Sequence, residues 1–459
     1  MHDTINTSAT RMSNYLITNV LIINEGVRTP GHVAIHDQLI TKIYPASAYP
    51  ATTKDTEIID GKGKWLIPGV IDDQVHFRDP GLTHKGDIYT ESKAAVAGGV
   101  TSFMDMPNTI PQTTTNALLK EKIAIAEGKS LANFGFFIGA TNKNLAELHA
   151  VDIHQTCGIK VFLGASTGNM LVDDPMALEG IFRIRKLPIA VHAEDEGVIK
   201  QNLEAFRKQF GDDIPMEYHP LIRSTEACYK SSSFAVELAR RHRTHLHLIH
   251  LSTAKELSLL DPPGPVKDKL ITTEVCVHHL WFDDQDYTDK GSLIKWNPSI
   301  KTAEDKEALI QALIDDRIDI VATDHAPHTL EEKDNIYTKA PSGAPMIQHS
   351  LPVMLEFHHK NIIPVEKIVE KMCHTPADIF HLRNRGYIRE GYYADLVLID
   401  PEDPWTVNSH NILYKCGWSP LEETSLRSRI THTFVNGNLV FDNGIFDESV
   451  KGLSLEFDR

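Results

Sequence analysis

Short apolar runs, each followed by a polar residue, recur through the middle of the chain. The clearest read VIDDQVHF, GIKVFLGAS, LPIAVHAE, HLHLIHLS and IDIVATDHA. Nearly continuous Val, Ile, Leu and Phe are typical of parallel strands that are buried on both faces. The polar residues at their carboxyl ends include five potential metal ligands, His76, Lys160, His192, His250 and Asp324. Their shared position predicts that the five side chains meet in one site.

Each of these residues has an ordinary explanation when it is considered alone. The chain contains 24 histidines, and a single histidine after a strand is more often hydrogen-bonded than metal-bound. A lysine that extends to water would explain Lys160, and a helix N-cap would explain Asp324. These separate explanations do not predict a shared position, so we favour a metal site.

Eight candidate strands alternate with helical patterns. They cover residues 70–77, 100–106, 133–140, 158–164, 187–194, 245–252, 270–278 and 317–324. The segment YTESKAAVAGG is helical in pattern and ends in a Gly98-Gly99 stop, and the long 195–244 connection is expected to contain an extra helix. This alternation predicts an α/β fold, a (β/α)8 TIM barrel whose strand carboxyl ends open on one face.

Short alternating runs at both chain ends predict a smaller β unit beside the barrel. They include YLITNVLII near the start, and YYADLVLID and ITHTFVNGNLVF near the end, where Asn436-Gly437 is a hairpin signal. We expect the two ends to pair into one β-sandwich. The predicted organisation is a disordered tail at 1–12, an N-terminal portion of the sandwich at 13–66, the barrel at 67–386, and a C-terminal portion of the sandwich at 387–459.

Charge and cysteine content limit the possible partners and compartment. A net charge of −16 argues against nucleic acid or an anionic membrane as a partner, and it means that an anionic substrate needs local cationic groups. The five cysteines are scattered without a CxxC pair, which indicates reduced thiols. The polar first eleven residues do not read as a signal peptide, and no run approaches the length of a membrane span. We expect a cytoplasmic protein.

Lys160 is the unusual member of the predicted ligand set, because an ammonium has no lone pair for a metal. In a dry pocket beside cations the neutral amine is favoured. That amine reacts with CO2 to give a carbamate, an anion able to bridge two metals. We expect His192 and His250 to bind one metal and His76 and Asp324 to bind the other, with a bridging hydroxide as the nucleophile.

Nine segments together resemble the dihydroorotases of the amidohydrolase superfamily. They are QVHFRDPG (74–81), AGGVTSFMDMPNT (97–109), GIKVFLG (158–164), VHAED (191–195), HLST (250–253), EVCVHHL (274–280), NPSIK (297–301), TDHAPH (323–328) and GYYADLVLID (391–400). They span nearly the whole chain in the family's order. The resemblance implies one or two Zn²⁺ ions, a carboxylated Lys160, and Asp324 as the group that passes a proton to the leaving ring nitrogen.

The resemblance also implies which residues recognise dihydroorotate. Arg78, Asn108 and His328 would hold its carboxylate, for which a planar guanidinium is well suited, and Asn297 would contact the ring. The loop APSGAPM (340–346), with Ser342 and Gly343, is similar to the family's substrate loop, although Met346 and Gln348 depart from its usual residues. An ordinary surface arginine is the alternative for Arg78.

One residue departs from the family pattern at the predicted metal site. The family has His-x-His after the first strand, whereas this chain has Gln74-Val75-His76. A neutral amide oxygen is a poorer zinc ligand than imidazole. The sequence therefore leaves three alternatives for the second metal site, with Gln74 as a poor ligand or none: the site is weaker, it binds another metal, or it is filled only with substrate present.

The sequence is compatible with three functions. The leading one is a zinc-dependent dihydroorotase of pyrimidine synthesis, acting on dihydroorotate and N-carbamoyl-L-aspartate as a homodimer. The second is another cyclic amidase, a hydantoinase or allantoinase, against which the combined HFR, MPNT and APH segments argue. The third is an inactive partner of aspartate carbamoyltransferase, which has no reason to retain the metal ligands.

Overall fold

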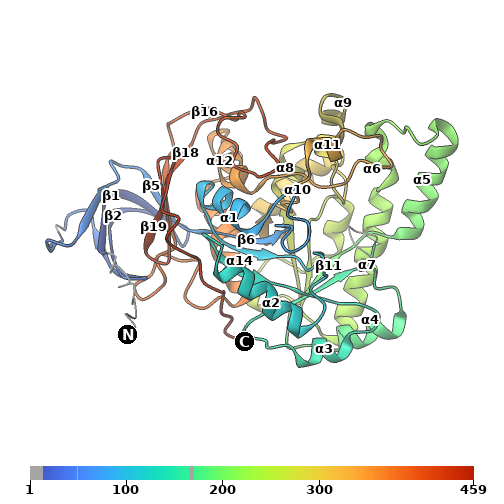
Figure 1. Ribbon diagram of the computed structural model, residues 1–459, viewed down its shortest axis with the longest axis horizontal. Coiled ribbons are helices and arrows are strands. Elements are labelled where there is room, and N and C mark those ends of the chain that lie inside the picture. The colour runs from blue at the N-terminus through green and yellow to red at the C-terminus, as the bar shows by residue number, and fades with distance from the viewer. Residues whose placement is uncertain (1–13, 49, 165–169) are drawn as a thin grey trace, which may run out of the picture.

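The computed structural model describes residues 14–48, 50–164 and 170–459. A β-sheet built from blue and dark red strands, which belong to the two chain ends, lies beside a barrel that is surrounded by helices (Figure 1). The expectation of a tail at 1–12 lies outside the described residues. In the described part of the chain no helix combines the length and the apolar character that crossing a membrane requires.

Within the described residues, eight parallel strands form the barrel where the apolar runs predicted them. One sheet contains β6 (Val70–Val75), β7 (Val100–Asp105) and β8 (Asn133–Phe136), and the next contains β9 (Ile138–Gly139), β10 (Ile159–Phe162), β11 (Ile189–His192), β12 (Leu246–Leu248), β13 (Ile271–Cys276) and β14 (Ile320–Ala322). We count β8 and β9 as one strand interrupted at Phe137. A parallel bridge between Val75 and His325 joins the first strand to the loop after the last one. The predicted TIM barrel is confirmed.

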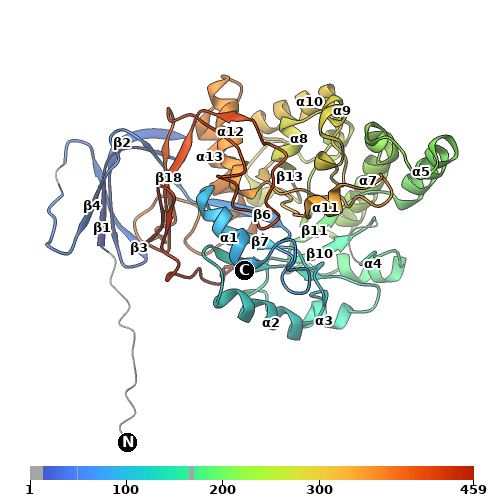
Figure 2. The same ribbon diagram turned by 45° about the horizontal axis from the view of Figure 1, so that its top comes forward.

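Helices surround the barrel strands on their outer side (Figure 2). They are α1 (Ile88–Ala97), α2 (Asn116–Glu127), α3 (Leu145–Ala150), α4 (Pro175–Phe182), α5 (Glu196–Phe210), α6 (His219–Ile222), α7 (Thr225–His242), α8 (Val277–Trp281), α9 (Tyr287–Lys290), α10 (Ala303–Ile314), α11 (Leu330–Lys333), α12 (Ser350–His359), α13 (Val365–Val369) and α14 (Thr375–Phe380). The 195–244 connection holds α5, α6 and α7, so the expected extra helix is present.

Local signals explain where α1 begins and ends. Asp87 accepts a hydrogen bond from the backbone N–H of Thr90, and the Thr90 hydroxyl bonds back to the Asp87 backbone, which forms a capping box. The predicted stop is confirmed, because the helix ends at Ala97, Gly98 is its C-cap, and Gly99 has φ +83°. A Cβ on Gly98 would lie 2.4 Å from the Gln348 carbonyl oxygen. Glycine therefore allows α1 to pack closely against the chain before α12.

The two chain ends form one sheet of nine strands in the described residues. Its members are β1 (Asn14–Asn24), β2 (Val27–His36), β3 (Leu39–Pro45), β4 (Glu57–Asp60), β5 (Trp65–Pro68), β15 (Leu396–Asp400), β18 (Arg429–Val435), β19 (Asn438–Asp442) and β20 (Ile445–Phe446), while β16 (Trp405–Thr406) pairs with β17 (Ser425–Leu426). The ends meet where β5 pairs antiparallel with β15. An isolated bridge between Leu39 and Tyr393 brings the far edge back toward β15, so the sheet rolls over its own core.

Two features define the join between sheet and barrel. β5 of the terminal sheet ends at Pro68, and the first barrel strand, β6, begins at Val70. The last residues leave the sheet and run along the barrel, where Ser454 bridges to Phe134 and Phe457 bridges to Leu382. The C-terminal segment therefore packs on the barrel.

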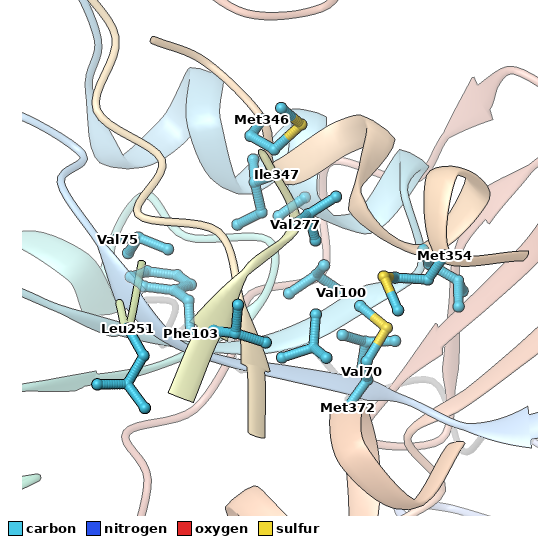
Figure 3. Packing of buried hydrophobic residues seen from close by; sticks show 14 of the residues in the cluster. Val70, Val75, Val100, Phe103, Leu251, Val277, Met346, Ile347, Met354 and Met372 are labelled. Carbon is cyan, nitrogen blue, oxygen red and sulfur yellow. The ribbon is translucent and has the colours of Figure 1, made fainter. Parts of the chain in front are cut away.

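The main core lies between the barrel strands and their covering helices. Figure 3 shows side chains from β6 and β7 packed with residues from much later in the chain; the labelled ones are Val70, Val75, Val100, Phe103, Leu251, Val277, Met346, Ile347, Met354 and Met372. Burial of these apolar side chains contributes roughly 1.5–3 kcal/mol each. This packing holds the strand ends, and with them the candidate site, in fixed positions.

Candidate active site

A pocket opens at the carboxyl ends of the barrel strands. Its lining includes Gln74, His76, Arg78, Asn108, Lys160, Phe162, His192, His250, Trp296, Asn297, Asp324, Ala326, Ser342 and Gly343. All five predicted metal ligands lie in this lining, although up to 248 positions separate them in the sequence. Barrel closure brings them together, as their shared position at the strand ends predicts.

His192 and His250 form one side of the pocket. Nδ1 of His192 lies 2.9 Å from Nε2 of His250, and burial holds the pKa of both imidazoles below the usual range. Glu194 Oε2 lies 3.0 Å from the other ring nitrogen of His192. Although burial opposes ionisation, the nearby charge of Arg223 lowers the pKa of Glu194 to about 2. A carboxylate behind a neutral histidine is the usual support of a metal ligand.

His76 and Asp324 form the other side, and Gln74 joins them through its amide nitrogen. Nε2 of His76 lies 3.0 Å from Oδ1 of Asp324, and Nε2 of Gln74 donates to the same oxygen at 3.1 Å. An ionised carboxylate only accepts hydrogen bonds, so the amide must present its nitrogen there. The amide oxygen of Gln74 instead faces the Cys276 thiol at 4.0 Å.

Lys160 is the second residue of β10, and its side chain lines the same pocket. It is 1% exposed, and burial lowers its pKa to about 8 despite the opposing charges of Glu274 and Asp324. At neutral pH a fraction of about one tenth is therefore uncharged, which is the form that reacts with CO2.

Three site residues have left-handed backbone conformations. Arg78 has φ +67°, His250 has φ +42° and Asp324 has φ +44°. Such conformations are unfavourable for residues other than glycine, and they cluster at functional sites where the surrounding structure enforces them. The strain here coincides with the predicted ligands and the predicted substrate arginine.

The predicted substrate residues separate into two groups. Arg78, Asn108, Asn297, Ser342 and Gly343 line the pocket. His328 is absent from this lining, because it lies behind Arg78, and its Nε2 is 3.1 Å from Nη2 of the guanidinium. Its position thus supports a role in holding Arg78.

Arg78 makes its end of the pocket cationic. Nε of Arg78 donates to the Pro327 carbonyl at 3.1 Å, and the side chain is 3% exposed. Burial lowers its pKa to about 10, so the guanidinium stays charged at pH 7. Lys85 Nζ approaches Nδ1 of His328 at 3.1 Å. Lys85 also pairs with Glu332 at 3.3 Å, so Arg78 is the cation that supplies the local charge an anionic substrate needs in an acidic protein.

A buried ionic cluster in the barrel was not anticipated. His247 Nε2 lies 3.1 Å from Asp73 Oδ2 and 3.3 Å from Glu274 Oε2, and all three residues are buried. Glu274 also accepts the backbone N–H of His250 at 3.0 Å. The sequence did carry a signal for this cluster, namely an ionisable residue inside an apolar strand. His247 lies within β12, and Glu274 lies within β13.

The donor set fits metal ions. The facing nitrogens of His192 and His250, the carboxylate of Asp324 beside His76, and a lysine of lowered pKa provide the nitrogen and oxygen ligands that divalent zinc accepts. Gln74 is the exception, because its oxygen points away from Asp324.

Comparisons with known proteins agree with this geometry. Residues 65–440 match the model of the amidohydrolase family. Dihydroorotase from Methanosarcina acetivorans is 33% identical over 90% of this chain and 88% of its own length, and dihydroorotase from Pyrococcus furiosus is 32% identical over 90% and 89%. The chain belongs to the dihydroorotase family of amidohydrolases. Members of the amidohydrolase family generally use metal ions.

Solved structures of amidohydrolases share this fold. L-hydantoinase from Arthrobacter aurescens has a TM-score of 0.88 at 25% identity, covering 95% of this chain and 98% of that one. Dihydropyrimidinase from Brevibacillus agri has a TM-score of 0.85 at 23% identity, covering 97% and 100%. These enzymes are similar in architecture, so the choice of substrate has to be argued from the pocket.

Proposed function

We propose that this protein is a metal-dependent dihydroorotase that interconverts L-dihydroorotate and N-carbamoyl-L-aspartate in pyrimidine synthesis. The observation that carries the proposal is Arg78, a buried and charged guanidinium that lines the same pocket as the candidate metal ligands. Similarity to dihydroorotases over nine tenths of the chain supports it.

The proposed metal ligands divide by their contacts. Carboxylated Lys160, His192 and His250 would hold one Zn²⁺, and His76 and Asp324 would hold a second. When bound, zinc supplies an acidified water and polarises the carbonyl of the scissile amide. Gln74 donates to Asp324, so the second ion has fewer good ligands than the first.

Asp324 is the proposed proton carrier. Its Oδ1 already faces His76 and Gln74, so Oδ2 is the oxygen left to take a proton from the attacking water. The same oxygen then delivers the proton to the ring nitrogen as the amide bond breaks. A carboxylate that is fixed by two donors keeps its orientation through both transfers.

Arg78 and its neighbours would select the substrate. The guanidinium donates to the Pro327 carbonyl. In the His328 tautomer whose Nε2 carries the lone pair it also donates to His328, and three N–H groups then remain for the substrate carboxylate. Asn108 and Asn297 line the pocket beside it, and Asn297 Oδ1 is buried without a hydrogen bond among the described residues. That oxygen is available to accept a ring N–H.

Two alternatives can be tested together with this function. Hydantoinases and allantoinases would share the metal centre, whereas an inactive partner of aspartate carbamoyltransferase would not need it. Purified protein should be assayed with dihydroorotate, hydantoin, allantoin and an uncharged dihydropyrimidine, with metal content measured on the same sample. We expect turnover of dihydroorotate in strong preference to the others. Preference for an uncharged ring, or metal-loaded protein without activity, would overturn the proposal.

The proposal also covers the oligomeric state and the cellular location of the protein. We propose a cytoplasmic homodimer that has no nucleic acid or membrane partner. Aspartate carbamoyltransferase is the protein partner whose association should be tested. Size-exclusion chromatography with light scattering, with and without that enzyme, measures both.

A further inference from the structure

A second group of metal-binding side chains lies beside the catalytic ligands without belonging to them. Cys276 ends β13, and His278 and His279 follow in α8. One ligand atom from each lies within 4.8 Å of the others, and all three residues are buried. None of them is among the residues that line the catalytic pocket.

The hydrogen bonds of the two histidines leave nitrogens without partners. Nε2 of His279 lies 3.2 Å from the Pro298 carbonyl, to which it must donate, so Nδ1 carries a lone pair. Nδ1 of His279 and both ring nitrogens of His278 are buried and have no hydrogen-bond partner among the described residues. The Thr323 backbone lies near His278, but outside hydrogen-bond geometry.

Buried ring nitrogens without hydrogen bonds are energetically unfavourable in an apolar core unless a ligand binds them. Buried polar atoms in folded proteins are almost always hydrogen-bonded, and several unsatisfied nitrogens in adjacent rings need an explanation. A histidine that binds a metal usually donates its other ring nitrogen to a backbone carbonyl, as His279 does. His278 is stacked on Trp296, with ring centroids 3.9 Å apart and planes 5° apart, which leaves its in-plane nitrogens available.

We propose that Cys276, His278 and His279 bind a zinc-class divalent cation at a site distinct from the catalytic centre. A thiolate and two imidazoles are ligands that zinc prefers, and the Cys276 thiol releases its proton to solvent on binding. The Gln74 amide oxygen, 4.0 Å from Cys276 Sγ, is placed to approach the fourth position. Gln74 thereby faces this site with its oxygen and the catalytic site with its nitrogen.

Cobalt substitution tests this proposal directly, because the catalytic ligands contain only nitrogen and oxygen. Apoprotein is prepared with a chelator, loaded with Co²⁺ alone, and examined for the near-ultraviolet charge-transfer band of a thiolate–Co²⁺ bond. Zinc content per chain is measured in parallel. We expect the band in the unaltered protein, and its loss with about one equivalent of zinc in Cys276→Ser and in His279→Gln.

Matched variants make the result decisive. Cys157→Ser removes a buried thiol elsewhere and should keep the band, and Lys160→Ala should keep it while losing catalytic metal. Thermal unfolding shows that each variant is folded. Absence of the band in unaltered protein loaded with Co²⁺, or its persistence in folded Cys276→Ser, would overturn the site. Loss of the band in Lys160→Ala would place the sulfur ligand in the catalytic centre and also overturn it. A failed activity assay would bear on the proposed function alone.

Discussion

Replacement of Arg78 by lysine tests how the pocket recognises a carboxylate. The guanidinium has five N–H donors, and its contacts with Pro327 and with the His328 tautomer whose Nε2 carries the lone pair leave three. An ammonium has three donors, so the same two contacts would leave one. Arg78→Lys should therefore keep the positive charge and lose the bidentate contact with dihydroorotate.

The magnitude follows from the one charged hydrogen bond that is lost. Such a bond contributes about 1.5–3 kcal/mol, and each 1.36 kcal/mol corresponds to a factor of about ten in rate. We expect kcat/KM for dihydroorotate to fall roughly 10- to 150-fold, mainly through KM. For an uncharged dihydropyrimidine the same variant should change kcat/KM little.

Steady-state kinetics with metal analysis of each preparation provide the measurement. Arg385→Lys is a matched control, because Arg385 is also buried and instead pairs with Asp395. That variant is expected to affect stability and not kcat/KM. A fully metal-loaded Arg78→Lys protein with kcat/KM close to that of the unaltered enzyme would refute the reasoning about the carboxylate.

The remaining predictions concern the metal ligands and the proton carrier. Asp324→Asn should lower kcat at least ~100-fold, the scale of a lost acid–base group; near-normal turnover would contradict its role. Intact-mass or diffraction measurements should show Lys160 extended by CO2, and Lys160→Ala should lose metal and regain partial activity with short carboxylates; an active, metal-loaded protein with a bare amine would refute this. Burial lowers the pKa of Lys160 to about 8, so at fixed CO2 the carboxylation rate of apoprotein should rise about tenfold per pH unit below pH 8 and level off above it; a rate independent of pH would contradict the buried amine. Chelator titration should remove the ion at His76 and Asp324 first, and Gln74→His should tighten it; equal occupancy at limiting zinc, unchanged in Gln74→Ala, would show that Gln74 has no influence on that ion.

The apolar runs determined the barrel and the identity of the strand-end residues. Parallel strands that are buried on both faces require continuous apolar sequence, which is a local property that can be read one segment at a time. Because all barrel strands end on one face, the position of His76, Lys160 and Asp324 in their runs also predicted that these residues meet. The hairpin at Asn436-Gly437 was equally local, since its two residues with positive φ define the turn.

Only the tertiary structure decided how the polar groups pair. The amide nitrogen of Gln74 faces Asp324, which is 250 positions away, and His328 lies behind Arg78, also 250 positions away. No local pattern encodes such contacts, because a side chain's hydrogen bonds depend on which distant donors and acceptors barrel closure brings within about 3 Å. The strand pattern shows which residues share the pocket, while their orientation depends on the packing of the whole barrel.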